Sequence, residues 1–319
     1  MRVTAMRNVI AIAAVALLVA FPLAARHWQQ LFYVSFASRI LIYALAASSL
    51  NLILGYGGMV SFGHAAFLGT GAYTVAMLMA QGLSSAWASW PLAVVVSALF
   101  ALVIGAVSLR TRGVYFIMIT LAFAQMIYYV FVSLRSYGGE DGLNLTARSG
   151  LGFGLDLASD VTFYYVVLAM VVACLYLMQR LLDARFGQVI QGIRDNEMRM
   201  EALGFATYRY KLICFSLAGG AAGLAGALLA NQNGFVSPNL LQWTQSGTLM
   251  VMVILGGVGY VYGGVLGAGV FLVLEEVLSA YTEHWQLALG LALLAIVLYA
   301  RGGIAGLLSR PTRGGEPGG

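Results

Sequence analysis

The chain has 319 residues, of which 61% are hydrophobic and only 9% are charged. A soluble globular protein carries about 25% charged residues, so this composition excludes a soluble domain and indicates that lipid is the solvent. The net charge of +5 does not indicate a nucleic-acid partner, because Lys and Arg also orient membrane helices. Cys174 and Cys214 both lie in apolar runs and have the spacing of neither a metal site nor a disulfide framework.

Apolar segments that can cross a hydrocarbon core of about 30 Å recur along the whole chain. They cover residues 8–25, 38–54, 64–81, 91–109, 114–134, 161–179, 212–231, 245–262, 263–280 and 285–300. The runs lack the strict polar and apolar alternation of membrane β-strands. The predicted fold is therefore all-α, a polytopic transmembrane helical bundle of about eight to ten spanning helices with Gly-rich breaks. We assign residues 1–310 to this single domain and expect a disordered tail at 311–319.

The first apolar segment allows two interpretations. Arg2 and Arg7 precede it, and small residues follow it, as in a cleaved signal peptide. The alternative is an uncleaved first spanning helix. We favour the uncleaved helix, because the later helices also need a fixed starting orientation.

The basic residues predict how the helices are oriented. With ten crossings and both termini in the cytoplasm, 13 of the 17 Lys and Arg residues fall on the cytoplasmic side. These are Arg2, Arg7, Arg110, Arg112, Arg180, Arg185, Arg194, Arg199, Arg209, Lys211, Arg301, Arg310 and Arg313. The bias agrees with the positive-inside rule.

The stretch 51–67 is dense in glycine, which favours a break in a membrane helix. Unwound backbone inside a membrane is tolerated where it is buried in protein or lines a watery cavity. We therefore predict that this stretch contacts a solute pathway through Gly57, Gly58, Ser61, Gly63 and His64. Close helix packing through small residues is the alternative, and both can hold together.

Other polar groups in apolar runs are fewer. Thr120 and Gln125 are expected within the membrane and are assigned to the same pathway, although a lone buried amide often serves only as a contact between helices. A second glycine cluster at 256–264 predicts a tight turn between two helices. Glu275 and Glu276 are adjacent carboxylates within an apolar run and leave open the alternative of a proton- or sodium-coupled transporter.

The most polar part of the chain is the predicted cytoplasmic stretch 180–211. Within it, Met198, Ala202 and Phe205 recur with helical spacing, while Glu197 and Glu201 share another face. Asp195 is suited to cap this short helix and Gly204 to end it. We predict that it docks on a partner protein, with lipid-surface binding as the alternative. The assigned coupling residues are Arg194, Asp195, Asn196, Glu197, Glu201, Ala202, Leu203 and Gly204.

The sequence also excludes ATP binding by this chain. A phosphate-binding loop needs Gly-Lys followed by Ser or Thr, whereas the sole lysine, Lys211, follows Tyr210. We expect no metal site and no cofactor of its own, because the three histidines, His27, His64 and His284, are far apart. A membrane enzyme that acts on lipids, a further alternative, would need clustered polar residues that the chain lacks.

Several of these motifs together resemble a known family. They comprise the stretch 55–67, residues 112–116 and 120–123, the Gly-Gly-Glu-Asp-Gly-Leu run at 138–143, residues 193–197 and 201–204, Ser237-Pro238, and the Leu-Gly-Gly-Val-Gly run at 255–259. In this order, and over nearly the whole chain, they resemble the permeases of branched-chain (hydrophobic) amino-acid ABC importers of the LivM type. Two departures, Gln188 and Met200, affect the details of docking.

The resemblance implies a subunit in a prokaryotic inner membrane that works with a second related permease, two cytoplasmic ATPases and an external solute-binding protein. ATP would be used by the ATPases, and residues 197–204 would dock into them. The expected substrate is a branched-chain or other hydrophobic amino acid. Related permeases for urea or short amides share many of the motifs and remain an alternative. Besides membrane lipid, no other partner class and no nucleic acid is expected.

Overall fold

The computed structural model describes residues 16–22, 31–152, 157–281, 283–299 and 302–308. The expected tail at 311–319 and most of the first apolar segment lie outside these residues. The α-helices after the short helical segment 16–22 are α2 (Leu31–Asn51), α3 (His64–Ala80), α4 (Ala86–Ser108), α5 (Val114–Ser133), α6 (Asp160–Asp183), α7 (Arg185–Asp195), α8 (Glu197–Ala202), α9 (Thr207–Asn233), α10 (Trp243–Gly256), α11 (Gly263–Tyr281), α12 (Trp285–Tyr299) and α13 (Gly303–Leu308).

The shorter elements connect these helices. A π-helix, η1 (Leu52–Tyr56), continues α2, and three 3₁₀ turns are η2 (Arg135–Tyr137), η3 (Gly139–Asp141) and η4 (Pro238–Leu241). Two short strands, β1 (Leu143–Asn144) and β2 (Phe235–Val236), pair antiparallel, with Leu143 opposite Val236. The all-α membrane bundle predicted from the sequence is confirmed.

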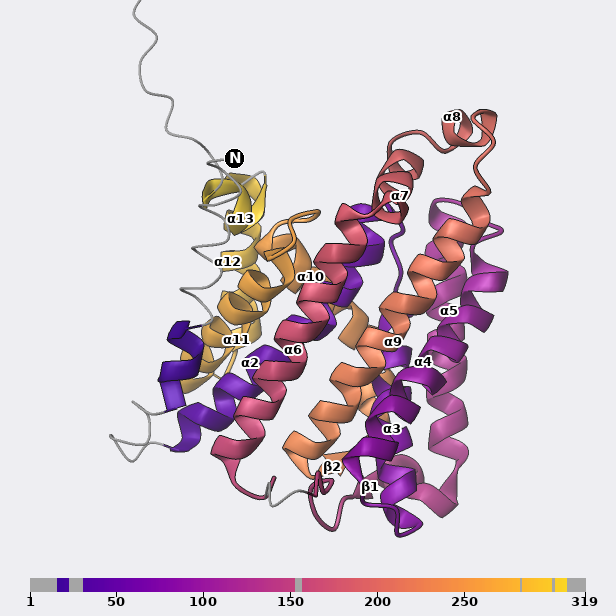
Figure 1. Cartoon of the computed structure of the whole chain (residues 1–319). Helices are drawn as coiled ribbons and strands as arrows, with labels where there is room; N and C mark the ends of the chain where they lie inside the picture. Colours follow the sequence, from indigo (N-terminus) through magenta and orange to yellow (C-terminus); the bar gives the residue numbers. More distant parts are fainter. Residues whose placement is uncertain (1–15, 23–30, 153–156, 282, 300–301, 309–319) are drawn as a thin grey trace, which may run out of the picture.

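The long helices lie side by side and run between two ends of the bundle (Figure 1). One end carries α7 and α8, and the other carries β1 and β2; we call them the α8 end and the β1–β2 end. Six helices of the described part are long and apolar enough to cross a membrane, and α3 and α10 are shorter apolar helices. This architecture is that of a multi-pass membrane protein.

Two helices form the centre of the bundle. In the most apolar window of each, α9 and the combined α2–η1 helix are 72% buried, against 22–33% for the other four candidate spans. Small residues let the interior helices approach each other closely. A Cβ on Gly226 of α9, for example, would overlap the carbonyl oxygen of Leu68 on α3. A Cβ on Gly71 of α3 would likewise overlap Gly223 of α9. In lipid, where apolar burial gives little driving force, such close backbone contact is a main source of helix association.

Two sequence-based boundaries need correction. The predicted crossing 245–262 is one helix only as far as Gly256, because Gly257 (φ 116°) and Gly259 (φ 81°) adopt conformations that a helix does not use. The predicted segment 38–54 begins earlier, at Leu31, and ends in the π-helix η1. The tight turn expected at the second glycine cluster is confirmed at 257–262, between α10 and α11.

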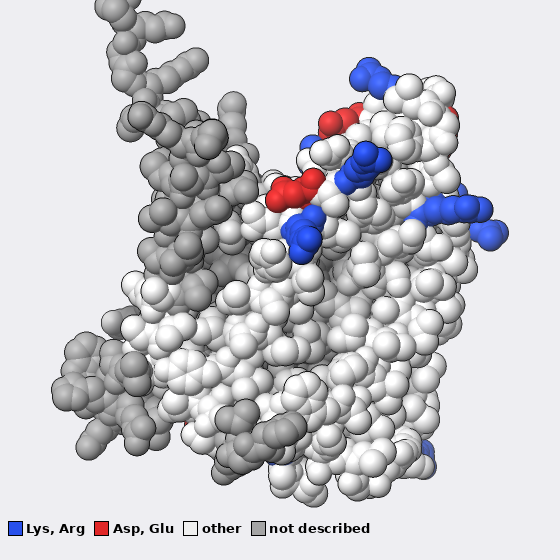
Figure 2. Space-filling view, viewed as in Figure 1, with Lys and Arg blue, Asp and Glu red and all other residues white. Residues whose placement is uncertain are grey.

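Charge gathers at one end of the molecule. Figure 2 shows most of the visible Lys and Arg at the α8 end, and α7 and α8 contribute Arg185, Arg194 and Arg199. At the β1–β2 end, Arg148 pairs with Asp160 at 2.6 Å, and its guanidinium lies 4.7 Å from the ring centre of Phe163. This asymmetry is the one that the sequence predicted from the order of the apolar segments.

Candidate functional site

The Gly-rich stretch after α2 is a broken helix, as predicted. The π-helix η1 ends at Tyr56, and residues 57–63 run as a turn and extended backbone until α3 begins at His64. Gly58 has a φ of 67°, which favours glycine, and Met59 N donates to Ile53 O at 2.9 Å. A π-helix within α-helical structure is rare and frequent at functional sites.

Three of the predicted pathway residues, Ser61, Gly63 and Thr120, lie close together where the broken segment meets α5. Phe62 N donates to Thr120 Oγ1 at 3.3 Å, and Gly63 N donates to Ser61 Oγ at 3.1 Å. A Cβ on Gly63 would lie 3.1 Å from the carbonyl oxygen of Thr120, so glycine allows the close approach. Thr120 is about 9 Å along α5 from its first residue. The broken segment therefore packs against α5 inside the bundle.

Gln125 does not belong to this group of contacts. It is half-buried on α5, five residues beyond Thr120, so it points about 140° away around the helix. In the described part of the chain, its side chain makes no hydrogen bond with the broken segment.

His64 turns toward α2 and away from α5. Its Nε2 lies 2.8 Å from Ser49 Oγ, and Ser49 Oγ donates its one proton to Ala46 O at 2.7 Å. His64 Nε2 must then be the donor to Ser49, a tautomer assigned from the hydrogen-bond network. Nδ1 is buried and has no partner among the described residues. The imidazole is thus packed in the core between α2 and α3.

Two short helices begin close to each other in the interior. Ala65 N, at the start of α3, donates to Ser246 Oγ in the first turns of α10 at 2.8 Å, and the rings of Phe62 and Trp243 are 6.2 Å apart. Helices of 17 and 14 residues are about 25 and 21 Å long, which is less than a hydrocarbon core of about 30 Å. Neither helix is long enough to complete a crossing by itself.

The predicted docking segment consists of two helices, α7 and α8, joined at Asn196. The sequence assigned the cap to Asp195, but Asp195 is the last residue of α7 and Asn196 caps α8. Asn196 has extended backbone, and its Oδ1 accepts from Arg199 N at 2.9 Å. The stop at Gly204 has the expected left-handed conformation, with a φ of 86°.

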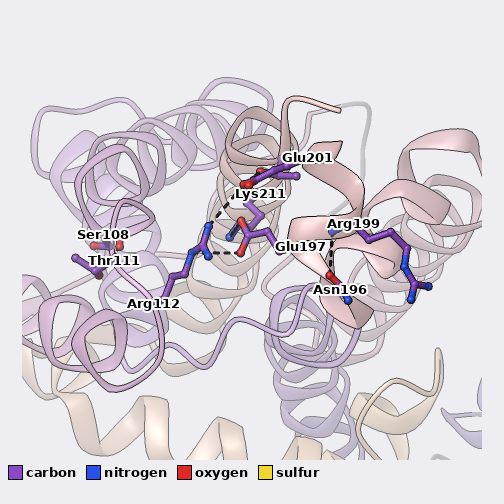
Figure 3. Close-up of polar contacts among 9 residues, drawn as sticks. Ser108, Thr111, Arg112, Asn196, Glu197, Arg199, Glu201 and Lys211 are labelled. Atoms are coloured by element: carbon purple, nitrogen blue, oxygen red, sulfur yellow. Dashed lines mark hydrogen bonds and ion pairs between the residues drawn. The ribbon is translucent and has the colours of Figure 1, made fainter. Parts of the chain in front are cut away.

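The acidic face of α8 points toward the bundle (Figure 3). Lys211 Nζ of α9 lies 2.5 Å from Glu197 Oε1, and Arg112 lies 3.5 Å from Glu197 and 3.6 Å from Glu201. Thr207 Oγ1 also donates to Glu201 Oε1 at 3.0 Å. Arg112 stands on the turn after α4, where Thr111 Oγ1 donates to Ser108 O at 2.8 Å. These contacts hold α8 to α9 and to the turn between α4 and α5.

Three apolar side chains of α8 and of its C-cap are exposed, whereas Met200 of the same helix packs against the core. Met198 is 71% exposed and Leu203 is 67% exposed, and Ala202 is exposed beside them. Phe205, which the sequence placed on the same face, is less exposed, and its ring lies 6.3 Å from that of Tyr210. We call Met198, Ala202 and Leu203 the α8 tip. An exposed apolar tip on a helix that ion pairs hold to the bundle is suited to contact another protein.

Arg194 joins the docking segment to the broken helix. Its Nη1 donates to Gly55 O of η1 at 2.6 Å, while Nε and Nη2 contact Asp195 Oδ1 at 3.2 and 3.1 Å. Gly55 is not one of the predicted pathway residues, but Gly58 is, and a Cβ on Gly58 would lie 2.8 Å from Arg194 Cγ. The predicted docking residue Arg194 is therefore next to a predicted pathway residue.

The sequence did not identify several residues of this site. Lys211, Arg112, Asn51 and Ser246 take part through contacts with residues far along the chain. For Lys211 there was a signal, because it is the sole lysine and ends the most polar stretch of the chain, 180–211. For Ser246 there was none.

The intramembrane carboxylates lie elsewhere. Glu275 Oε1 is 3.8 Å from Arg39 Nη2, an ion pair between α11 and α2. Within the described residues, no group of three or more His, Cys, Asp or Glu residues could hold a metal ion.

Comparison with known proteins covers most of the chain. The sequence profile described as the branched-chain amino acid transport system permease component matches residues 32–300. The chain is 29% identical over 295 residues to the high-affinity branched-chain amino acid transport system permease protein LivM of Salmonella typhimurium, covering 85% of this chain and 69% of that protein.

Two relatives from Escherichia coli K12 are also similar. LivM of that strain is 29% identical over 294 residues, covering 85% of this chain and 69% of that protein. The high-affinity branched-chain amino acid transport system permease protein LivH is 25% identical over 286 residues, covering 84% of this chain and 92% of that protein. No solved structure matches the chain.

Proposed function

The chain belongs to the branched-chain amino acid transport permease family, and from this membership we propose that it is the membrane-spanning subunit of an ATP-driven importer. It provides the passage through the bilayer, and partner ATPases provide the energy. The observation that carries the proposal is the α8 tip, whose exposed Met198, Ala202 and Leu203 are held in place by the ion pairs of Glu197 and Glu201 on a neighbouring face of α8.

The α8 tip supports docking on a cytoplasmic partner. Exposed apolar side chains on a short helix fit a groove on another protein, as in other helix-in-groove contacts. Because Glu197 and Glu201 are engaged with Arg112 and Lys211, a push on the tip is transmitted to α9 and to the turn before α5. The α8 end is then the cytoplasmic end, in agreement with the positive-inside rule, and both termini lie on that side of a prokaryotic inner membrane.

The relatives support the first of the proposed partners, a second permease. Both LivM and LivH are permease proteins of one kind of transport system and both resemble this chain, which supports a pair of related permeases. Two ATPases on the cytoplasmic side and an external solute-binding protein complete the proposed complex. The chain itself carries out no catalysis and binds no cofactor.

The proposed substrate is a branched-chain or other hydrophobic amino acid. This rests on the names of the relatives, and urea or a short amide is the alternative. The pathway is proposed to pass the broken segment 57–63 where it meets Thr120 on α5. Helix breaks in transporters supply unsatisfied backbone groups to a solute passing through the membrane.

The proposal is tested by reconstitution. The complex is purified with its partners, which mass spectrometry identifies, and inserted into lipid vesicles with external binding protein. Uptake of radiolabelled leucine is then compared with uptake of labelled urea and acetamide, with ATP or ADP supplied on the ATPase side. We expect leucine uptake only with ATP and only with the ATPases present. Accumulation by the lone chain, or uptake driven by a proton or sodium gradient without ATP, contradicts the proposal.

A further inference from the structure

The further inference concerns the contact between Arg194 and Gly55. Arg194 is in the last turn of α7, and its guanidinium reaches out of the docking segment to the π-helix η1. The distance from Nη1 to Gly55 O is 2.6 Å, which is short for a hydrogen bond from a charged donor. Asp195 Oδ1 accepts from the other side of the guanidinium and orients it.

Gly55 O needs such a partner because the helix stops there. The last carbonyl groups of a helix have no N–H donor within the helix and must accept hydrogen bonds from donors elsewhere. After Tyr56 the backbone turns and becomes extended, so the next residues do not continue the ladder. Arg194 supplies the donor from a segment 139 residues away in the sequence.

The fit around Arg194 depends on glycine. A Cβ on Gly58 would lie 2.8 Å from Arg194 Cγ, and Gly58 has a φ of 67°. A Cβ on Gly259 would lie 3.7 Å from Arg194 Nη1. The aliphatic part of Arg194 therefore lies against the broken segment, and its charged end lies close to the turn between α10 and α11.

Asn51 connects the turn between α10 and α11 to the start of η1. Its Oδ1 accepts from Gly259 N at 3.0 Å, and its Nδ2 donates to Tyr260 O at 2.8 Å. Asn51 is buried and directly precedes η1. A displacement of η1 thus changes the contacts of α7 and of the turn 257–262 together.

We propose that Arg194 is a positioning residue that makes the conformation of the broken helix η1 depend on the position of the docking segment. It acts through Gly55 O and not by touching the ATPase. This inference rests on the proposed function. When ATP binding moves the α8 tip, α7 moves with it. Because Arg194 is bonded to Gly55 O, η1 and the start of the segment 57–63 then move as well.

A cysteine of the chain, Cys214, can report the position of η1. Cys214 on α9 is buried, and its Sγ lies 3.9 Å from Leu52 O, the first residue of η1. A movement of η1 away from α9 uncovers this thiol. Cys174, which is half-buried on α6, is first replaced by Ser so that Cys214 is the single thiol of the chain.

The test uses the complete complex in lipid vesicles, with Arg194→Ala, Arg194→Lys and Arg185→Ala. Arg185 is the matched control, because it is an exposed arginine of the same helix whose side chain makes no hydrogen bond or ion pair with the described residues. Three quantities are measured: co-purification of the ATPases, leucine taken up per ATP hydrolysed, and the rate at which N-ethylmaleimide labels Cys214 with and without ATP.

In the parent and Arg185→Ala complexes, ATP should change the labelling rate of Cys214. In Arg194→Ala the ATPases should still co-purify and hydrolyse ATP, while leucine uptake per ATP falls by about tenfold or more, as expected for the loss of a charge-assisted hydrogen bond. Labelling should no longer respond to ATP. Arg194→Lys keeps the charge and one donor and should recover part of the coupling.

Two results overturn the inference while the proposed function stands. One is normal coupling and ATP-dependent labelling in Arg194→Ala. The other is loss of ATPase co-purification in Arg194→Ala without recovery in Arg194→Lys, which would make Arg194 a docking or folding residue. If the parent complex shows no ATP-driven uptake, the proposed function fails and this inference fails with it.

Discussion

Lys211 and Glu197 form the closest ion pair between α8 and the rest of the described bundle. Lys211 Nζ lies 2.5 Å from Glu197 Oε1, and the two side chains are only 11% and 20% exposed. The sole lysine of the chain is therefore used to hold the docking segment on α9. Because both charges are largely removed from water, Lys211 depends on Glu197 for compensation, whereas Glu197 also has the exposed Arg112 at 3.5 Å.

Removal of one charge of the Lys211–Glu197 pair should therefore lower the stability of the folded protein. Glu197→Met should lower the free energy of unfolding by about 3 kcal/mol, because it leaves Lys211, whose side chain is only 11% exposed, as a charge without a carboxylate partner among the described residues. The double variant Lys211→Met with Glu197→Met should recover most of the loss. Unfolding of the purified chain by titration with sodium dodecyl sulfate measures both. As control, Arg112→Met should change stability by about 1 kcal/mol or less, since that side chain is 62% exposed. Equal losses in the single and double variants would show that charge compensation is not the cause.

The turn after α8 should be sensitive to proline. Gly204 has a φ of 86°, whereas proline holds φ near −65° and also removes the N–H that Gly204 donates to Glu201 O at 2.9 Å. Gly204→Pro should displace the α8 tip, so that ATPase co-purification weakens and uptake per ATP falls by about tenfold or more.

Gly82 offers a matched control for this change. It has a φ of 84°, donates to Met79 O at 2.9 Å and, like Gly204, has no described atom within 4 Å of a Cβ placed on it. It lies on the turn after α3, on the far side from α8. Gly82→Pro should leave co-purification and coupling unchanged. Similar coupling defects in both variants would point to general destabilisation.

The broken segment should not tolerate a large side chain at Gly57. A Cβ there would lie 2.8 Å from Ile53 O and 2.7 Å from Met59 Cε, so Gly57→Leu should shift the segment 57–63. We expect leucine uptake to fall by about tenfold or more, while the amount of assembled complex stays the same. Size-exclusion chromatography and vesicle uptake measure the two effects. Normal uptake would remove this segment from the pathway, and loss of the complex would assign it to packing.

The contact between α3 and α9 predicts a different defect. A Cβ on Gly226 would overlap the backbone oxygen of Leu68, so Gly226→Leu should separate the two helices and cost about 3 kcal/mol or more. We expect a loss of folded protein and not a selective loss of coupling. Gly290 on α12 has no described atom within 4 Å of an added Cβ, and Gly290→Leu should be tolerated. Thermal unfolding in detergent compares them. A stable Gly226→Leu would contradict the close approach of α3 and α9.

The sequence by itself determined the class of the protein and the places where its helices break. Long apolar runs with few charges can form only membrane helices, because backbone groups in lipid must be satisfied within the segment. Glycine density located the break after α2 and the turn at 257–262, since both need backbone conformations or approaches that a Cβ prevents. The left-handed stop at Gly204 followed from the same property.

Only the tertiary structure decided which of these residues meet. Lys211 and Glu197 are close because α9 returns past α8, and Arg194 reaches Gly55 because α7 lies on the end of α2 and η1. His64 faces Ser49 and not the segment near Thr120, a choice made by the rotation of α3 in the bundle. Helical spacing gives the relative positions of side chains on one helix but not the neighbour each face will contact. That neighbour depends on how all the helices pack together.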